Sequence, residues 1–73
     1  MGLRNHVKQH RARLDLTQAE LGRRVGVRRQ TILAIEKQRY APSALLAFRL
    51  ARALGLRADE LFELDEEEGT REE

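Results

Sequence analysis

The 73-residue sequence has no cysteine and no tryptophan, and its aromatic residues are one tyrosine and two phenylalanines. Without thiols the chain can form neither disulfides nor a cysteine-ligated zinc site, which fits a reducing cytoplasm. No apolar run approaches the roughly 20 residues of a membrane-spanning helix, and the start lacks the apolar core of a signal peptide. We therefore expect one small, soluble, cytoplasmic domain without membrane association.

Residues suited to catalysis or to holding a cofactor are also scarce. There is no nucleophile with a base beside it and no glycine-rich phosphate loop. His6 and His10 stand four residues apart, a spacing that can place two imidazoles on one metal, but the sequence shows no third ligand. The adjacent carboxylates of residues 66–68 lack the fixed geometry of a metal or catalytic site. We expect no enzyme, no cofactor and no metal.

Acidic residues are few in most of the chain and are concentrated near its end. Residues 1–58 contain thirteen lysines or arginines and three acids, a charge of +10, whereas residues 59–73 contain one arginine and nine acids, a charge of −8. The positive charge of residues 1–58 suits neutralisation of phosphate groups and salt-dependent binding of nucleic acid. The alternative is a basic surface that contacts only solvent. The segment 65–73 is too charged to pack, so we expect a disordered acidic tail whose role the sequence does not define.

The stretch from residue 16 to residue 36 has the pattern of two short helices joined by a tight turn. Thr17 and Glu20 form the T-x-x-E pattern of a capping box, and Gly26 tolerates the left-handed backbone that ends a helix. In a second helix over residues 29–37, Ile32 and Ile35 share the inner face. The opposite face carries Gln30, Leu33, Ala34 and Lys37, with Arg29 at its edge. Such a helix can anchor in a core and lie in a DNA groove, although an ordinary amphipathic helix has the same pattern.

Three further helices are expected around this unit. The first runs from about Asn5, its N-cap, to Leu14, and His10 is expected to be a satisfied histidine inside the core. The next begins at the cap Ser43 and ends at Gly55. Its inward stripe is predicted to be Ala44, Ala47, Leu50, Ala51 and Leu54. A last helix over residues 58–62 would close the core with Leu56, Leu61 and Phe62.

The two-helix unit resembles the helix-turn-helix of the Cro and phage-repressor class, also called the Xre type. The matching positions are Thr17, Gln18, Glu20, Leu21, Gly26, Val27, Gln30, Thr31, Ile32, Ile35 and Glu36, and the likeness extends from about residue 5 to residue 62. It implies an all-α, five-helix, phage-repressor-like domain over residues 1–64 that binds the major groove of double-stranded DNA. Two positions depart from the pattern, since Arg28 replaces the usual serine or threonine cap and Gln38 replaces a common glycine.

The side-chain chemistry suggests which residues would contact DNA. Gln30 matches the donor and acceptor pair of adenine, Arg29 can form the two-pronged contact of guanine, and an exposed Leu33 or Ala34 could meet a thymine methyl. Phosphate contacts are expected from Gln18, Arg28, Lys37, Arg39 and Tyr40. In the family the residue that matches Gln18 touches the DNA backbone. For Tyr40, a ring that caps the core is about as plausible.

Arg11 and Glu36 each interrupt an apolar stripe. A chain this small tolerates unpaired buried charge poorly, so the two side chains are expected to pair. The resemblance also implies a structural ion pair at these two positions. Neither is therefore expected to contact DNA.

One short reading helix offers few base contacts, so we expect a homodimer on a palindromic operator. Leu45, Leu61 and Leu64 are assigned to the interface, and residues 61–65 could add a short dimerisation strand, paired with residues 1–4. Scattered surface leucines are the alternative. The expected function is transcriptional regulation, most often repression in this family, with any small-molecule effector unknown.

Two other functions are compatible with the sequence. The first is an antitoxin that represses its own operon, which the acidic tail disfavours because it offers little apolar surface to mask a toxin. The second is a protein-interaction adaptor that keeps the fold without reading DNA. Arg29 and Gln30 on the outer face of the second helix favour recognition of DNA bases over an adaptor function.

Overall fold

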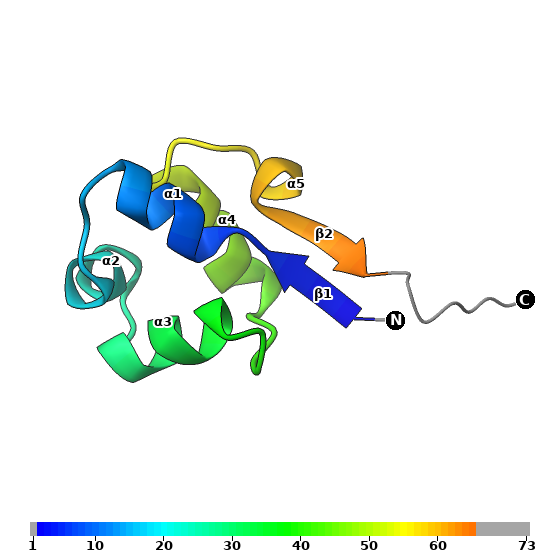
Figure 1. Ribbon diagram of the computed structural model, residues 1–73, viewed down its shortest axis with the longest axis horizontal. Helices are drawn as coiled ribbons and strands as arrows, with labels where there is room; N and C mark the ends of the chain where they lie inside the picture. The colour runs from blue at the N-terminus through cyan, green and yellow to red at the C-terminus, as the bar shows by residue number, and fades with distance from the viewer. Residues whose placement is uncertain (1, 66–73) are drawn as a thin grey trace, which may run out of the picture.

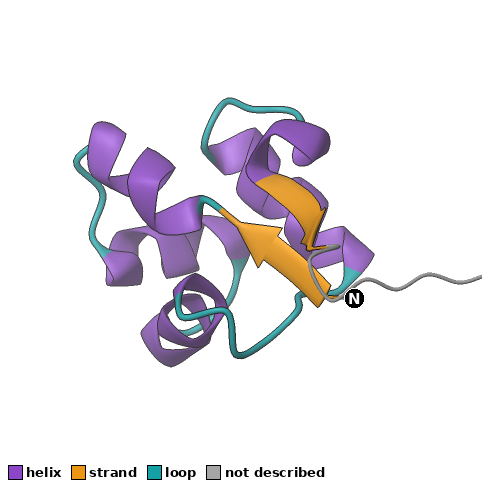
Figure 2. Ribbon diagram, turned by 45° about the vertical axis from the view of Figure 1, so that its right-hand side comes forward, coloured by secondary structure: helices purple, strands orange, loops and turns teal. Residues whose placement is uncertain are grey.

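The computed structural model describes residues 2–65, which form five helices and a pair of strands (Figure 1). In chain order these are β1 (Gly2–Asn5), α1 (Val7–Arg13), α2 (Gln18–Val25), α3 (Arg29–Glu36), α4 (Ala44–Ala53), α5 (Ala58–Leu61) and β2 (Phe62–Asp65). The helices enclose one core, and the two strands lie together at one end of the molecule in Figure 1, and side by side in Figure 2 (orange). The predicted five-helix fold is confirmed. None of the described helices has the length and apolarity needed to span a bilayer.

Every helix contributes to the core. Its buried apolar residues are Val7, Leu21, Val25, Ile32, Ile35, Leu46, Leu50, Ala51, Leu54, Leu61 and Phe62. The predicted stripe of α4 is wrong at its start, because Ala44 is exposed and Leu46 is buried instead. Leu46, Leu50 and Leu54 recur at four-residue intervals and so form one row, which turns Ala44 outward.

The local signals of α2 are confirmed. Glu20 N donates to Thr17 Oγ1 at 3.0 Å and Thr17 N donates to Glu20 Oε1 at 2.8 Å, which completes the capping box. Hydrogen bonding of the Glu20 carboxyl to Thr17, first to its backbone N–H and then to its side chain, lowers the pKa of that carboxyl below its ordinary value. Gly26 ends the helix in the left-handed region, with φ 82°.

Gly22, in the middle of α2, lies directly against the turn that leads to α3. Val27 N donates to the carbonyl oxygen of Gly22 at 2.9 Å. A Cβ at Gly22 would lie 2.6 Å from the carbonyl oxygen of Val27. The absence of a side chain therefore sets how closely the first turn of α3 approaches α2.

We expect Gly22→Ala to lower the free energy of unfolding by about 2 kcal/mol. Overpacking against a backbone atom costs about 3 kcal/mol at the upper end of its usual range, and the gain in helix propensity returns about 1 kcal/mol. Urea denaturation followed by circular dichroism measures the change. Gly2→Ala is the matched control, since a Cβ there has nothing within 4 Å. Equal stability of the Gly22→Ala variant would contradict the tight approach.

The amino-terminal segment differs from its prediction. Asn5 ends β1, the N-cap of α1 is His6, and the helix begins at Val7. Asn5 still serves the helix start, because its Oδ1 accepts a hydrogen bond from Val7 N at 3.0 Å. Residues 2–5 form a strand, so their backbone cannot also extend α1 toward the amino terminus. His10 is half-buried and accepts a hydrogen bond from Arg13 at the surface, so its expected place inside the core is wrong.

The two ends of the domain pair with each other as antiparallel strands. The register places Leu3 opposite Leu64 and Asn5 opposite Phe62. The strand predicted over residues 61–65, paired with residues 1–4, therefore exists as β2 paired with β1. The pairing lies within one chain and not in a dimer, and Phe62 belongs to β2 and not to α5.

Two assignments near the carboxyl end need correction. Leu61 is fully buried in the core of a single chain, so it cannot form part of a dimer surface as expected. Asp65, placed in the acidic tail, belongs to β2 and forms an ion pair with Arg4 at 3.4 Å. The remainder of the predicted tail, residues 66–73, lies outside the described residues.

Candidate nucleic-acid interface

Helix α3 lies at one edge of the molecule in both ribbon views (Figures 1 and 2). Its inner face is anchored by Ile32 and Ile35, both fully buried. Its first turn begins after the Gly26 turn and has no side-chain cap, since Arg28 cannot accept a backbone hydrogen bond. The opposite side of α3 is left free for contact with a large partner.

The first turn of α3 presents polar side chains to solvent. Arg28, Arg29 and Gln30 are consecutive and exposed. Leu33 and Ala34 are half-buried, so Leu33 is less accessible than expected. The exposed reading positions are therefore concentrated at the amino-terminal end of α3, which is the end that helix-turn-helix proteins direct at base edges.

A second group of exposed residues follows α3. Lys37, Arg39 and Tyr40 are all exposed; Tyr40 is 47% accessible and does not belong to the core cluster. This contradicts the alternative in which Tyr40 caps the core. Within residues 2–65, no acid forms a salt bridge with Arg28, Arg29, Lys37 or Arg39. These cations remain available for phosphate groups.

Arg11 and Glu36 lie together as the predicted ion pair. Arg11 Nε donates to Glu36 Oε2 at 2.6 Å, and Arg11 Nη2 donates to Glu36 Oε1 at 3.3 Å. The side chains are 15% and 3% exposed, respectively. Arg11 Nη1 also donates to the carbonyl oxygen of Leu16 at 2.8 Å. This bidentate pair joins α1 to the last turn of α3 and satisfies a carboxylate that is almost wholly buried.

Gln18 extends the ion pair to the start of α3. Its Nε2 donates to Glu36 Oε1 at 3.0 Å, and its Oε1 accepts a long hydrogen bond from Arg29 Nη1 at 3.5 Å. The amide thus bridges the buried carboxylate and the exposed guanidinium. The place of Gln18 at the start of α2 predicts only a phosphate contact, and no spacing in the sequence indicates this link. The Arg29 guanidinium therefore lies beside the amide of Gln18.

Gln38 is a second residue whose role the sequence did not reveal. Its backbone takes the left-handed conformation at φ 62°, where the family commonly has glycine. Its Oε1 accepts from Asn5 N at 3.2 Å and its Nε2 donates to the Asn5 carbonyl oxygen at 3.2 Å. Asn5 Nδ2 in turn donates to the Ile35 carbonyl oxygen at 2.9 Å. These bonds fix the end of α3 to β1.

Comparison with known proteins agrees with this geometry. The family model described as helix-turn-helix matches residues 7–61. A protein from Methanothermobacter thermautotrophicus, described as an HTH-type transcriptional regulator, is 54% identical over 66 residues, which cover 89% of this chain and 96% of that protein. One of the same description from Bacillus subtilis is 46% identical over 65 residues, covering 89% of this chain and 98% of that protein.

A solved structure shows the same fold. The clp gene regulator ClgR from Corynebacterium glutamicum superposes with a TM-score of 0.70 at 24% sequence identity, covering 74% of this chain and 57% of that chain. The family is shown by the match over residues 7–61 and by the two relatives at 54% and 46% identity. The chain belongs to the helix-turn-helix family and is a transcriptional regulator of the Xre/Cro class.

Proposed function

We propose that this regulator binds a palindromic operator as a homodimer and represses transcription by occupying it. The observation that carries the proposal is the division of α3, with Ile32 and Ile35 fully buried and Arg28, Arg29 and Gln30 exposed on consecutive positions. This arrangement allows the first turn of α3 to enter the major groove while the core holds its orientation.

The residues divide into two roles under this proposal. Arg29 and Gln30 read bases, because guanidinium and amide groups match the edges of guanine and adenine. Leu33 and Ala34 supply secondary apolar contact from their half-buried positions. Gln18, Arg28, Lys37, Arg39 and Tyr40 bind phosphates, which fix the register but carry no sequence information.

The small size of the reading helix supports a dimer. Helix α3 has eight residues, of which only the first turn presents exposed polar side chains on consecutive positions. Two copies double the base contacts and require half-sites about one DNA turn apart, roughly 34 Å. Repression requires nothing beyond occupancy of the operator, whereas activation also requires a contact with the transcription machinery. We therefore favour repression.

Selection of binding sites from random DNA duplexes tests the proposal. We expect the intact protein to enrich a two-fold symmetric motif whose half-sites are separated by about one helical turn. Recovery of a single, asymmetric half-site would contradict the dimeric operator. Salt-sensitive binding with no enriched motif would contradict base reading altogether and would favour a nonspecific binder or an adaptor.

A further inference from the structure

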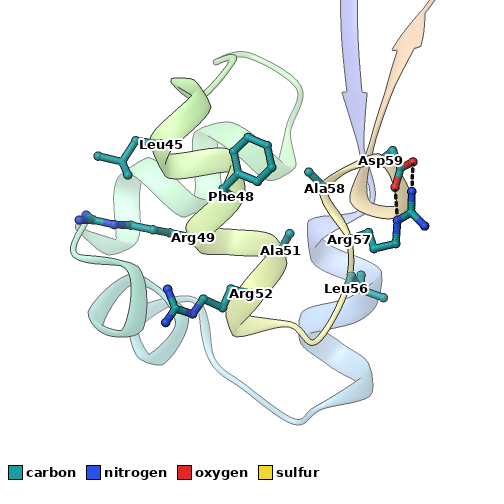
Figure 3. A pocket seen from close by; sticks show the side chains of 9 residues that line it. All are labelled: Leu45, Phe48, Arg49, Ala51, Arg52, Leu56, Arg57, Ala58 and Asp59. Atoms are coloured by element: carbon teal, nitrogen blue, oxygen red, sulfur yellow. Dashed lines mark hydrogen bonds and ion pairs between the residues drawn. The ribbon is translucent and has the colours of Figure 1, made fainter.

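Three arginines from two helices line one hollow on the surface of the protein. We call them the arginine cluster: Arg24 lies in the last turn of α2, and Arg49 and Arg52 lie three residues apart on α4. Together with Ala53 they line a hollow of about 310 Å³. Figure 3 shows Arg49 and Arg52 extending from α4 on the side away from Arg57 and Asp59. Among the described residues, the lining of this hollow thus has three cationic groups and no acid.

The positive charge of the arginine cluster is only partly offset by its surroundings. Within residues 2–65, none of the three arginines forms a salt bridge. Glu20 lies one turn before Arg24, but its carboxylate accepts a hydrogen bond from Thr17 N at 2.8 Å. The carboxyl-terminal ends of α2 and α4 each contribute about half a negative charge. Three guanidinium charges exceed the sum of these contributions, so the hollow remains positive.

Arginines on other parts of the surface are paired with acids. Arg57 Nη2 lies 3.0 Å from Asp59 Oδ2, and Arg4 Nη2 lies 3.4 Å from Asp65 Oδ2. Like charges three or four residues apart on a helix lower its stability, so the arrangement of α4 is unfavourable for the free protein. A hollow lined by charges of one sign attracts and concentrates ligands of the opposite sign. The arginine cluster therefore has the properties of an anion-binding site.

The chemistry of the cluster indicates the class of its ligand. A guanidinium group is planar and binds the oxygens of a phosphate through two parallel N–H···O bonds. Three such groups around one hollow match an anion that carries several negative charges close together. A single carboxylate supplies only one such charge, whereas a chain of phosphates supplies several.

We propose that Arg24, Arg49 and Arg52 bind a small anion that contains a chain of phosphates, either free or attached to a nucleoside. None of the three belongs to the residues assigned to DNA. Arg49 Nη1 lies 3.8 Å from the position that a Cβ at Gly26 would take, so the site borders the turn that leads to α3. The inference goes beyond the proposed function and does not rest on it, because the anion binds in the absence of DNA.

Isothermal titration calorimetry of the full chain with tripolyphosphate, at physiological ionic strength, tests the site. We expect the variant Arg49→Gln, Arg52→Gln to raise the dissociation constant of tripolyphosphate about 100-fold, because each lost charge-assisted bond contributes about 10-fold. The matched control is Lys37→Gln, Arg39→Gln, which removes two exposed cations that do not line the hollow. It should change this dissociation constant less than about 3-fold, because salt screens exposed charges outside the site.

The two variants separate a specific site from a general attraction between anions and a basic protein. Equal loss of tripolyphosphate affinity in both variants would overturn the proposal, because any exposed cation would then contribute alike. Absence of tripolyphosphate binding to the wild-type chain would overturn it as well. Circular dichroism should show both variants folded, because all four side chains are exposed.

Binding of a labelled DNA duplex by the same two variants distinguishes the arginine cluster from the candidate DNA interface. Fluorescence anisotropy should show weaker binding by Lys37→Gln, Arg39→Gln, which lacks two expected phosphate contacts. The variant Arg49→Gln, Arg52→Gln should change the affinity for DNA less than about 3-fold, because salt screens charges outside the contact. If this variant lost as much affinity for DNA as for tripolyphosphate, the proposal would be overturned and the cluster would belong to the DNA interface.

Adenosine triphosphate distinguishes the two sources of a phosphate chain. An affinity within about 3-fold of that for tripolyphosphate would show that the cluster binds the phosphates alone. Tighter binding of adenosine triphosphate, lost in Arg49→Gln, Arg52→Gln, would identify a nucleotide as the ligand. Tight binding of adenosine triphosphate that persists in this variant would contradict the assignment of its phosphates to the arginine cluster.

Discussion

Replacing Glu36 with alanine is expected to lower the free energy of unfolding by about 3 kcal/mol. Breaking a buried ion pair on one side costs about 3–5 kcal/mol, because the remaining charge has lost its partner. Arg11 keeps its bond to the Leu16 carbonyl and is 15% exposed, which favours the lower end of that range. Gln18 loses its acceptor as well. For a domain of this size such a loss is a large part of the total stability.

Urea denaturation followed by circular dichroism measures this effect. Glu63→Ala is the matched control, since Glu63 Oε2 also lies within hydrogen-bond distance of a side chain on another element, His6 Nε2 at 3.1 Å, but the Glu63 side chain is 51% exposed. That variant should change stability by less than about 1 kcal/mol. If Glu36→Ala were no more destabilising than Glu63→Ala, the pair would not contribute through burial.

The double variant Arg11→Met, Glu36→Met separates two quantities. One is the net contribution of the ion pair to the free energy of unfolding, and the other is the cost of leaving one buried charge without its partner. Apolar residues of similar volume often replace a buried ion pair without net loss. We therefore expect the double variant to recover most of the stability that Glu36→Ala loses. A double variant as unstable as the single one would show that the bonds of Arg11 and Glu36 to Leu16 and Gln18 are themselves required.

Local sequence signals predicted local structure well. The capping box of Thr17 and Glu20, the Gly26 turn and the Ser43 cap depend on residues within a few positions of one another, and all three are present. The inner face of α3 followed from helical periodicity in the same way, with Ile32 and Ile35 buried. Such features are encoded by short-range hydrogen bonds and by the helix repeat.

Features that depend on distant parts of the chain were predicted less well. The pairing of β1 with β2 joins residues about 60 positions apart, and it moved the start of α1 from Asn5 to Val7. Leu61, at the end of α5, likewise lies in the core and not on a surface. Periodicity predicted most of the side of α4 that the core uses, but not that Leu46 replaces Ala44 at its start.

The candidate DNA interface was predicted in its exposed positions but not in the contacts between its side chains. Periodicity gave the outer positions Arg29 and Gln30, since both lie away from the isoleucine face. The bridge from Glu36 through Gln18 to Arg29 crosses from α3 to α2 and back, so no spacing rule in the sequence indicates it. Half-burial of Leu33 likewise depends on neighbouring elements.

Replacing Arg29 and Gln30 with alanine together is expected to remove nearly all preference for the selected operator. A good two-pronged base contact contributes about 1–3 kcal/mol, and a symmetric dimer makes four such contacts through these two residues. Even at the lower limit the loss is about 4 kcal/mol, or about 1000-fold in affinity. Fluorescence anisotropy with labelled duplexes compares the operator with a scrambled sequence. Binding to the scrambled duplex should weaken much less.

The paired variant Lys37→Ala, Arg39→Ala separates phosphate binding from base reading, because both residues are exposed cations that follow α3. It should weaken binding to the operator and to the scrambled duplex by the same factor. It should also reduce the slope of log affinity against log salt by about 3.6, since a dimer loses four phosphate contacts at about 0.9 each. Loss of operator preference in the Lys37→Ala, Arg39→Ala variant would contradict the assignment of these two residues to phosphates. Retention of operator preference in the Arg29→Ala, Gln30→Ala variant would contradict base reading by those residues.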